Sequence, residues 1–177
     1  MSLAVYPGSF DPPTIAHLAI VEAARTHVDE VRVVLSELAL GKADLAGRTH
    51  VADRLAVLER VARTRPWLSA AVTPARLVAD IATEAGADAV VMGADKWAQV
   101  CDPVWYRGSA EARDAALERL PRVLLARRAG TAIARPGSGP DVLVLDVDAA
   151  LHDVSATRAR AGERHLMLAE ARATALW

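Results

Sequence analysis

Short aliphatic runs recur along this chain, and the intervals between consecutive runs leave room for a helix. The runs occupy residues 3–6, 31–35, 68–72, 89–92, 123–126 and 142–145. The interval 49–64 has apolar residues at helical spacing: Val51, Leu55, Leu58 and Ala62. Arg54 and Arg60 lie off that stripe. Because parallel strands need long crossover connections, this alternation predicts an α/β fold, a doubly wound parallel sheet of about five or six strands with helices on both faces.

Size, charge and cysteine content limit the kinds of protein that this sequence can form. The chain has 177 residues, 53% hydrophobic and 24% charged, which suits one folded domain spanning residues 1–177. Its net charge of −1 gives no overall attraction to nucleic acid or to a membrane. Cys101 is the only cysteine, and no apolar stretch approaches the ~20 residues of a membrane span. With no basic leader segment, we expect a cytoplasmic protein without nucleic-acid or membrane partners.

The first aliphatic run leads into a glycine-centred turn and then into a helical segment. Such a turn offers unpaired backbone N–H groups and the positive end of a helix dipole to an anion. The backbone of Ser9 and Phe10 would then face a phosphate, with His17 donating to its oxygens as charge grows there. An ordinary turn, with Thr14 as the N-cap and His17 on the surface, is the alternative.

A second candidate anion site lies near residue 155. Ser155 and Thr157 carry hydroxyls at the start of a predicted helix, and Arg160 follows with a bidentate donor. A helix start capped by Ser155 or Asp153, with no ligand, is the alternative. The Ala, Arg and Glu content from residue 155 onward predicts one or two helices there.

Together the two segments resemble the HxGH/TxGH nucleotidyltransferase superfamily, whose fold is Rossmann-like. Its adenylyltransferases carry G-[ST]-F-D-P followed by [HT]-x-G-H, and here residues 8–12 read GSFDP and residues 14–17 read TIAH. Residues 154–160, VSATRAR, are similar to the family's I-S-S-T-x-I-R. Two positions differ, since Ala16 stands where the family usually has Gly and Ala156 replaces the second Ser.

A third segment bears on the acceptor. Residues 90–97, VVMGADKW, resemble the I-I-G-A-D segment of nicotinate- and nicotinamide-mononucleotide adenylyltransferases. The resemblance implies close backbone approach at Gly93 and ribose binding by Asp95. In that branch a downstream tryptophan receives the pyridine ring, so Trp105 and its rival Trp97 are acceptor-binding candidates. A place in the core or at an interface is the alternative for both. Thr14 instead resembles the pantetheine-phosphate branch.

Three basic residues complete the set that the resemblance implies. Members of the superfamily place a lysine after the second strand, at the phosphates, and an arginine in the following helix. Lys42 and Arg54 stand at those places, and Arg127 resembles the family's basic residue before a loop. Arg54 and Arg127 are therefore acceptor-binding candidates. Solvated surface positions are the alternative for all three.

The activity that the resemblance implies is transfer of AMP from ATP to the phosphate of an acceptor, with release of pyrophosphate. The implied catalytic residues are His17, Lys42 and Thr14. The implied nucleotide-binding residues are Gly8, Ser9, Phe10, Asp11, Gly93, Asp95, Ser155, Thr157 and Arg160. Nicotinate or nicotinamide mononucleotide is the favoured acceptor, and phosphopantetheine is the alternative. A nucleotide-binding sensor or partner subunit without turnover is a second alternative, motivated by Ala16 and Ala156.

The expected partners are small molecules, ATP and a phosphorylated acceptor. Mg²⁺ is expected to bind through the substrate phosphates, because the sequence has no His, Cys and Asp cluster with metal-ligand spacing. We therefore predict no dedicated metal site. Trp177 and the Ala- and Arg-rich segment before it would suit either internal packing or a homo-oligomer.

Overall fold

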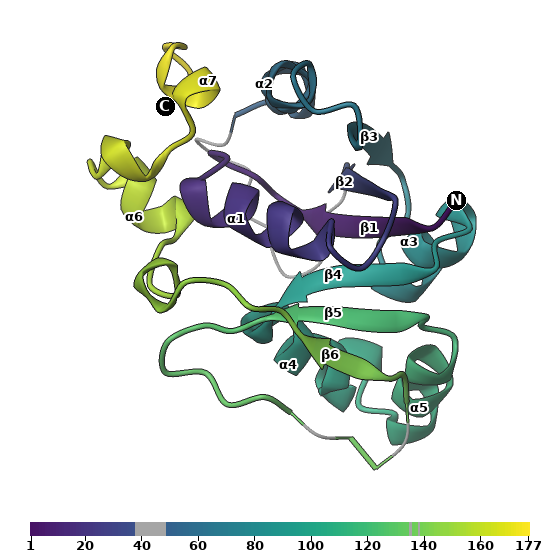
Figure 1. Cartoon of the computed structure of the whole chain (residues 1–177). Helices are drawn as coiled ribbons and strands as arrows, with labels where there is room; N and C mark the ends of the chain where they lie inside the picture. Colours follow the sequence, from purple (N-terminus) through teal and green to yellow (C-terminus); the bar gives the residue numbers. More distant parts are fainter. Residues whose placement is uncertain (38–48, 135, 138) are drawn as a thin grey trace.

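A computed structural model describes residues 1–37, 49–134, 136–137 and 139–177. Within these ranges a single sheet contains six strands (Figure 1): β1 (Leu3–Gly8), β2 (Glu30–Ser36), β3 (Leu68–Thr73), β4 (Ala89–Gly93), β5 (Arg122–Ala126) and β6 (Val142–Val144). The strand order is β3-β2-β1-β4-β5-β6, and every neighbouring pair is parallel. The predicted doubly wound parallel sheet is confirmed.

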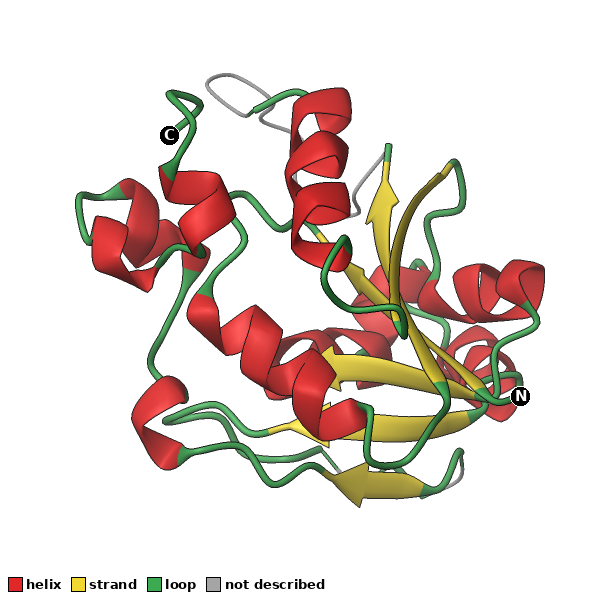
Figure 2. Ribbon diagram, turned by 45° about the horizontal axis from the view of Figure 1, so that its top comes forward, coloured by secondary structure: helices red, strands yellow, loops and turns green. Residues whose placement is uncertain are grey.

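Helices alternate with these strands and cover both faces of the sheet (Figure 2). They are α1 (Ile15–Ala24), α2 (Val51–Ala62), α3 (Val78–Ala85), α4 (Ala94–Cys101), α5 (Ala110–Glu118), α6 (Ala156–Arg160) and α7 (Ala169–Arg172). The described residues also form three short 3-10 helices, η1 (Pro103–Tyr106), η2 (Ala149–Leu151) and η3 (Arg164–Leu166). None of the helices in the described part of the chain has the length and apolar character needed to cross a bilayer.

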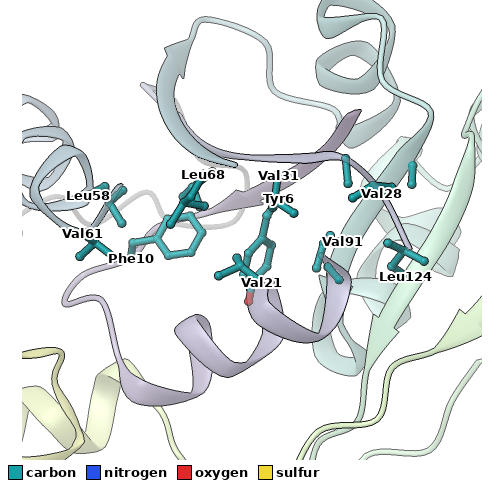
Figure 3. Close-up of a cluster of buried hydrophobic side chains, with 14 of the residues drawn as sticks. Tyr6, Phe10, Val21, Val28, Val31, Leu58, Val61, Leu68, Val91 and Leu124 are labelled. Atoms are coloured by element: carbon teal, nitrogen blue, oxygen red, sulfur yellow. The ribbon is translucent and has the colours of Figure 1, made fainter. Parts of the chain in front are cut away.

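Two hydrophobic cores lie on opposite faces of the sheet, because successive side chains of a strand alternate between its faces. Tyr6 of β1 packs with Val21 of α1 and Leu58 of α2 in the first core (Figure 3). Val5, its neighbour in sequence, packs in the second core with side chains of α3, α4 and α5. Both β1 residues are buried, as the continuous apolar runs predict for a sheet covered on two faces.

The order of the strands determines where a ligand site can form. The chain runs from β1 outward to β3 in one direction and from β4 outward to β6 in the other, with β1 and β4 adjacent. Helices therefore leave the carboxyl ends of β1 and β4 on opposite faces, α1 on the first and α4 on the second. A crevice opens at such a reversal of strand order.

The segment after residue 155 returns to the start of α1 (Figure 1). Thr14 and Met167 form an antiparallel bridge, and the backbone N–H of Leu168 donates to the carbonyl of Pro13 at 3.0 Å. This contact brings α6, η3 and α7 against the turn that follows β1. The two segments that the sequence analysis paired as anion sites are therefore neighbours in space.

Candidate active site

The turn between β1 and α1 is shaped by the burial of one aromatic side chain. Phe10 is 2% exposed and has a φ of 46°, and its ring centroid lies 5.1 Å from that of Tyr6 and 4.9 Å from that of His17. A Cβ atom at Gly8 would lie 2.7 Å from two carbons of the Phe10 ring. Glycine at position 8 is therefore required for the ring to fold under the turn.

Thr14 and His17 form a capping box at the start of α1. The backbone N–H of His17 donates to Thr14 Oγ1 at 3.4 Å, and the backbone N–H of Thr14 donates to His17 Nδ1 at 3.0 Å. Because Nδ1 accepts this hydrogen bond, it carries no proton, and the neutral imidazole must hold its proton on Nε2. The cap thus prepares His17 as a neutral N–H donor.

Thr14 itself lies behind the turn rather than at a surface where a substrate would bind. It is 1% exposed and is absent from the pocket wall described below. Its backbone and hydroxyl orient His17, and the direct catalytic contact expected of Thr14 stays a prediction.

Arg54 of α2 occupies a different place from the one the sequence indicated. It is 6% exposed although it lies off the apolar stripe, and its Nη1 donates to the carbonyl of Ser9 at 2.5 Å. Its Nε donates to the carbonyl of Thr49 at 3.0 Å. A guanidinium is tolerated inside a protein when its donors are matched by acceptors in this way. Arg54 thus supports the turn through the Ser9 carbonyl, and the acceptor contact expected of it stays a prediction.

The second predicted anion segment begins with a capped helix. Ser155 accepts a hydrogen bond from the backbone N–H of Arg158 at 3.2 Å and so caps α6, while the phosphate contact expected of it stays a prediction. Thr157 and Arg160 do reach the pocket, and Arg160 Nη2 donates to Thr157 Oγ1 at 3.3 Å. Arg160 Nη1 also donates to the backbone carbonyl of Asp11. The two anion segments are joined by this contact.

A pocket of about 400 Å³ lies at the carboxyl edge of the sheet, where the crevice was expected. Both helical layers and the segments after β5 contribute to its wall. Its members include residues 6–11, Ala16, His17, Arg76, Leu77, Val78, Gly93, Asp95, Lys96, Gln99, Trp105, Tyr106, Arg127, Arg128, His152, Thr157 and Arg160. A volume of this order suits a small organic ligand.

The charges in the wall are mostly positive. Asp95 forms an ion pair with Arg128, in which Asp95 Oδ2 lies 2.7 Å from Arg128 Nε. Asp95 Oδ1 accepts a hydrogen bond from Thr131 Oγ1 at 2.7 Å. The expected ribose-binding carboxylate is thus held in place by two neighbours. A Cβ at Gly93 would meet no protein atom within 4 Å, so the backbone there is open toward the pocket.

Two further cations in the wall were missed by the sequence analysis. Arg76 precedes α3 and is exposed, and no hydrogen bond or ion pair of its side chain occurs among the described residues. Lys96 in the first turn of α4 donates only to the neutral amide oxygen of Gln99, at 2.8 Å, within the same part of the structure. Burial lowers the pKa of Lys96. Arg76 lies outside the quoted motifs, and Lys96 follows Asp95 directly in the segment 90–97 but was assigned no role there.

The two tryptophan candidates separate clearly. Trp97 is fully buried in the second core, and its Nε1 donates to the carbonyl of Ala134 at 2.8 Å, which corrects its expected acceptor role. Trp105 in η1 is 36% exposed and lines the pocket, as does Arg127.

Lys42 falls outside the described residues. No group of three or more His, Cys, Asp and Glu side chains is placed to hold a metal ion in the ranges that the structure covers.

The parallel sheet, the reversal of strand order and the pocket at its carboxyl edge define a nucleotide-binding protein of the Rossmann-like class. The chain belongs to the cytidylyltransferase-like family, whose family model matches residues 5–162.

Curated relatives match part of the chain. A phosphopantetheine adenylyltransferase of Leifsonia xyli is 34% identical over 93 residues, 51% of this chain and 56% of the relative. That of Cutibacterium acnes is 37% identical over 90 residues, 51% of this chain and 54% of the relative. The chain therefore spans about half the length of the curated relatives it matches.

Solved structures match over more of the chain. A Plasmodium falciparum nicotinic acid mononucleotide adenylyltransferase complexed with APC has a TM-score of 0.59 and 13% identity, over 90% of this chain and 82% of that one. The same enzyme complexed with NaAD gives a TM-score of 0.61 and 11% identity at the same coverage. At this identity the likeness concerns the fold.

Proposed function

We propose that this protein is an adenylyltransferase that transfers AMP from ATP to the phosphate of nicotinate mononucleotide and releases pyrophosphate. The observation that carries the proposal is the meeting of His17 with Thr157 and Arg160 in one pocket, although about 140 residues separate them in the chain. Family membership and relatives named as adenylyltransferases support the same reaction class.

The proposed reaction requires charge stabilisation rather than a covalent enzyme intermediate. An oxygen of the acceptor phosphate forms a bond to the α-phosphorus of ATP. The bond from that phosphorus to the oxygen that bridges the α- and β-phosphates breaks. The leaving pyrophosphate takes the electron pair. His17 Nε2–H would donate to oxygens of the transferring phosphate, while Thr157 and Arg160 would bind the β- and γ-phosphates. Positioning and charge neutralisation would then supply most of the rate acceleration.

Mg²⁺ would be held by the phosphates of ATP, which suits an ion that commonly binds through substrate oxygens and few protein groups. The described residues contribute no cluster of acidic ligands for it. Lys42, which stands after the second strand in sequence, would add a further positive charge at the phosphates.

The acceptor is proposed on the basis of the wall formed by α3, α4 and η1. Trp105 offers an aromatic face there, while Arg76 and Lys96 are cations without a carboxylate partner among the described residues. Nicotinate mononucleotide has both a pyridine ring and a carboxylate in addition to its phosphate. Nicotinamide mononucleotide lacks the carboxylate, and the pantetheine arm of phosphopantetheine is neutral. Charge complementarity therefore favours the acid.

Phosphopantetheine is the second candidate, because the curated relatives named above are phosphopantetheine adenylyltransferases. The deciding experiment measures pyrophosphate release with ATP and Mg²⁺ and each of the three acceptors. We expect the highest kcat/KM with nicotinate mononucleotide, and a selective loss with that acceptor in Arg76→Gln. Preference for phosphopantetheine would replace the proposed acceptor while keeping the reaction class.

The same assay tests the sensor alternative. ATP binding by calorimetry without pyrophosphate release with any of the three acceptors would support a protein that binds nucleotide without turnover.

Arg119→Gln is a suitable control for Arg76→Gln in the acceptor assay, because Arg119 pairs with Asp80 at 2.7 Å and is not in the pocket wall.

A further inference from the structure

Trp177 makes a contact at the turn that no motif accounts for. Its indole Nε1 donates to Asp11 Oδ1 at 2.6 Å, across 166 positions of sequence. Asp11 belongs to the pocket wall and is 1% exposed. A hydrogen bond to a carboxylate in such a buried place is stronger than one at the surface, because water does not compete for it.

The indole is itself held by packing and by a polar contact. It packs against a hydrophobic cluster that includes Val57 of α2, Ala159 of α6 and Met167 after η3. Arg164 Nη1 donates to the backbone carbonyl of Trp177. The ring is thus fixed relative to both the turn and α6.

Asp11 also contacts Arg160, the cation proposed to bind phosphate. Arg160 Nη1 donates to the backbone carbonyl of Asp11, whereas the carboxylate oxygen Oδ2 lies 4.0 Å from the same nitrogen. A direct hydrogen-bonded ion pair would be about 1 Å shorter. The carboxylate therefore stands at the outer limit of an ion pair with Arg160 while its other oxygen, Oδ1, is bonded to Trp177.

We propose that Trp177 is a positioning residue that holds the Asp11 carboxylate away from Arg160. A phosphate and the Asp11 carboxylate would compete for the same guanidinium. With Oδ1 bound to the indole, Arg160 keeps its hydrogen bond to the Asp11 carbonyl and still presents donors to the pocket. Without the indole, the carboxylate would turn to Arg160 and weaken ATP binding. This inference rests on the proposed nucleotide transfer.

The test compares Trp177→Phe with the wild type. Phenylalanine keeps most of the apolar packing and removes the N–H donor. We expect the Kd and KM for ATP to rise about tenfold, the size of a lost hydrogen bond to a charged group, with kcat changed less than twofold. Combining it with Asp11→Asn should restore most of the ATP affinity, because an amide does not form an ion pair with Arg160.

Trp67→Phe is the matched control, because Trp67 is half-buried and lies outside the pocket wall. We expect this variant to lower Tm without changing the KM for ATP. If Trp177→Phe lowers Tm without changing the KM for ATP, the positioning role is overturned. It is also overturned if adding Asp11→Asn to Trp177→Phe does not restore the affinity for ATP. If the wild type neither binds ATP nor releases pyrophosphate, the proposed function fails, and this inference fails with it.

Discussion

At the scale of single residues, the state of His17 follows from its neighbours. Thr14 determines which ring nitrogen carries the proton, so the motif histidine is prepared as a donor before any ligand binds. A donor of this kind is worth most when charge grows on a phosphate oxygen during the reaction.

Replacement of His17 tests this role. His17→Ala should lower kcat for pyrophosphate release by on the order of 10²-fold, as the loss of a transition-state donor does elsewhere. His27→Ala is the control, because His27 is exposed and lies outside the pocket wall. Equal turnover in the two variants would contradict the role assigned to His17.

Lys96 illustrates a conflict between stability and binding. Burial lowers its pKa in the folded protein, so folding disfavours the protonated amine. The resulting loss of stability is fully present at neutral pH and disappears as pH rises through the folded and then the unfolded pKa. Lys96→Met should therefore have a Tm equal to or above that of the wild type at pH 7, with a smaller difference at pH 10.

The same variant should bind the acidic acceptor less tightly at pH 7. Thermal unfolding at the two pH values and the KM for nicotinate mononucleotide are the measurements. A Tm at pH 7 below that of the wild type would contradict the assignment of Lys96 as a cation kept at the expense of stability.

At the scale of elements, the connection from β1 to α1 depends on one close contact. Gly8→Ala would place a Cβ 2.7 Å from the buried ring of Phe10, which cannot move freely because it packs against Tyr6 and His17. We expect a loss of about 1–3 kcal/mol in the free energy of unfolding, the usual effect of overpacking.

Gly93→Ala is the contrasting variant at the end of β4. No protein atom lies within 4 Å of a Cβ there, so the free energy of unfolding should change little while nucleotide affinity falls. Urea denaturation and calorimetry with ATP separate the two effects. Similar losses of stability in both variants would show that the Phe10 contact is not the cause.

The sequence predicted the elements well, whereas the burial of certain side chains became visible only in the fold, for an identifiable reason. Aliphatic runs mark strands because a sheet buried on both faces needs apolar residues at every position. The helical pattern placed Arg54 off the apolar stripe, yet its donors are matched by carbonyl groups that only the folded turn presents. The resemblance offers Trp105 with Trp97 as its rival, and only the packing of α4 shows which one is buried.

At the scale of the whole molecule, the pocket combines parts that are far apart in the chain. The motifs predicted that residues near 10 and near 160 would meet, because the resemblance pairs them. They assigned no role to Arg76 or Lys96. Lys96 follows the motif residue Asp95 directly in sequence, whereas Arg76 joins the same pocket only through the fold. The contact of Trp177 with Asp11 also required the path of the chain after α6.

The packing of residues 155–177 against the turn between β1 and α1 links ATP binding to the stability of this segment. A form in which this segment has detached would lose Arg160 and the Asp11 contact together, so ATP should bind it far more weakly. Saturation with ATP at 100 times its Kd would then oppose detachment by about 2.7 kcal/mol. Limited proteolysis should show slower cleavage after the arginines of this segment when ATP is present. Cleavage at an unchanged rate would indicate that ATP binds equally well whether or not the segment is packed against the turn.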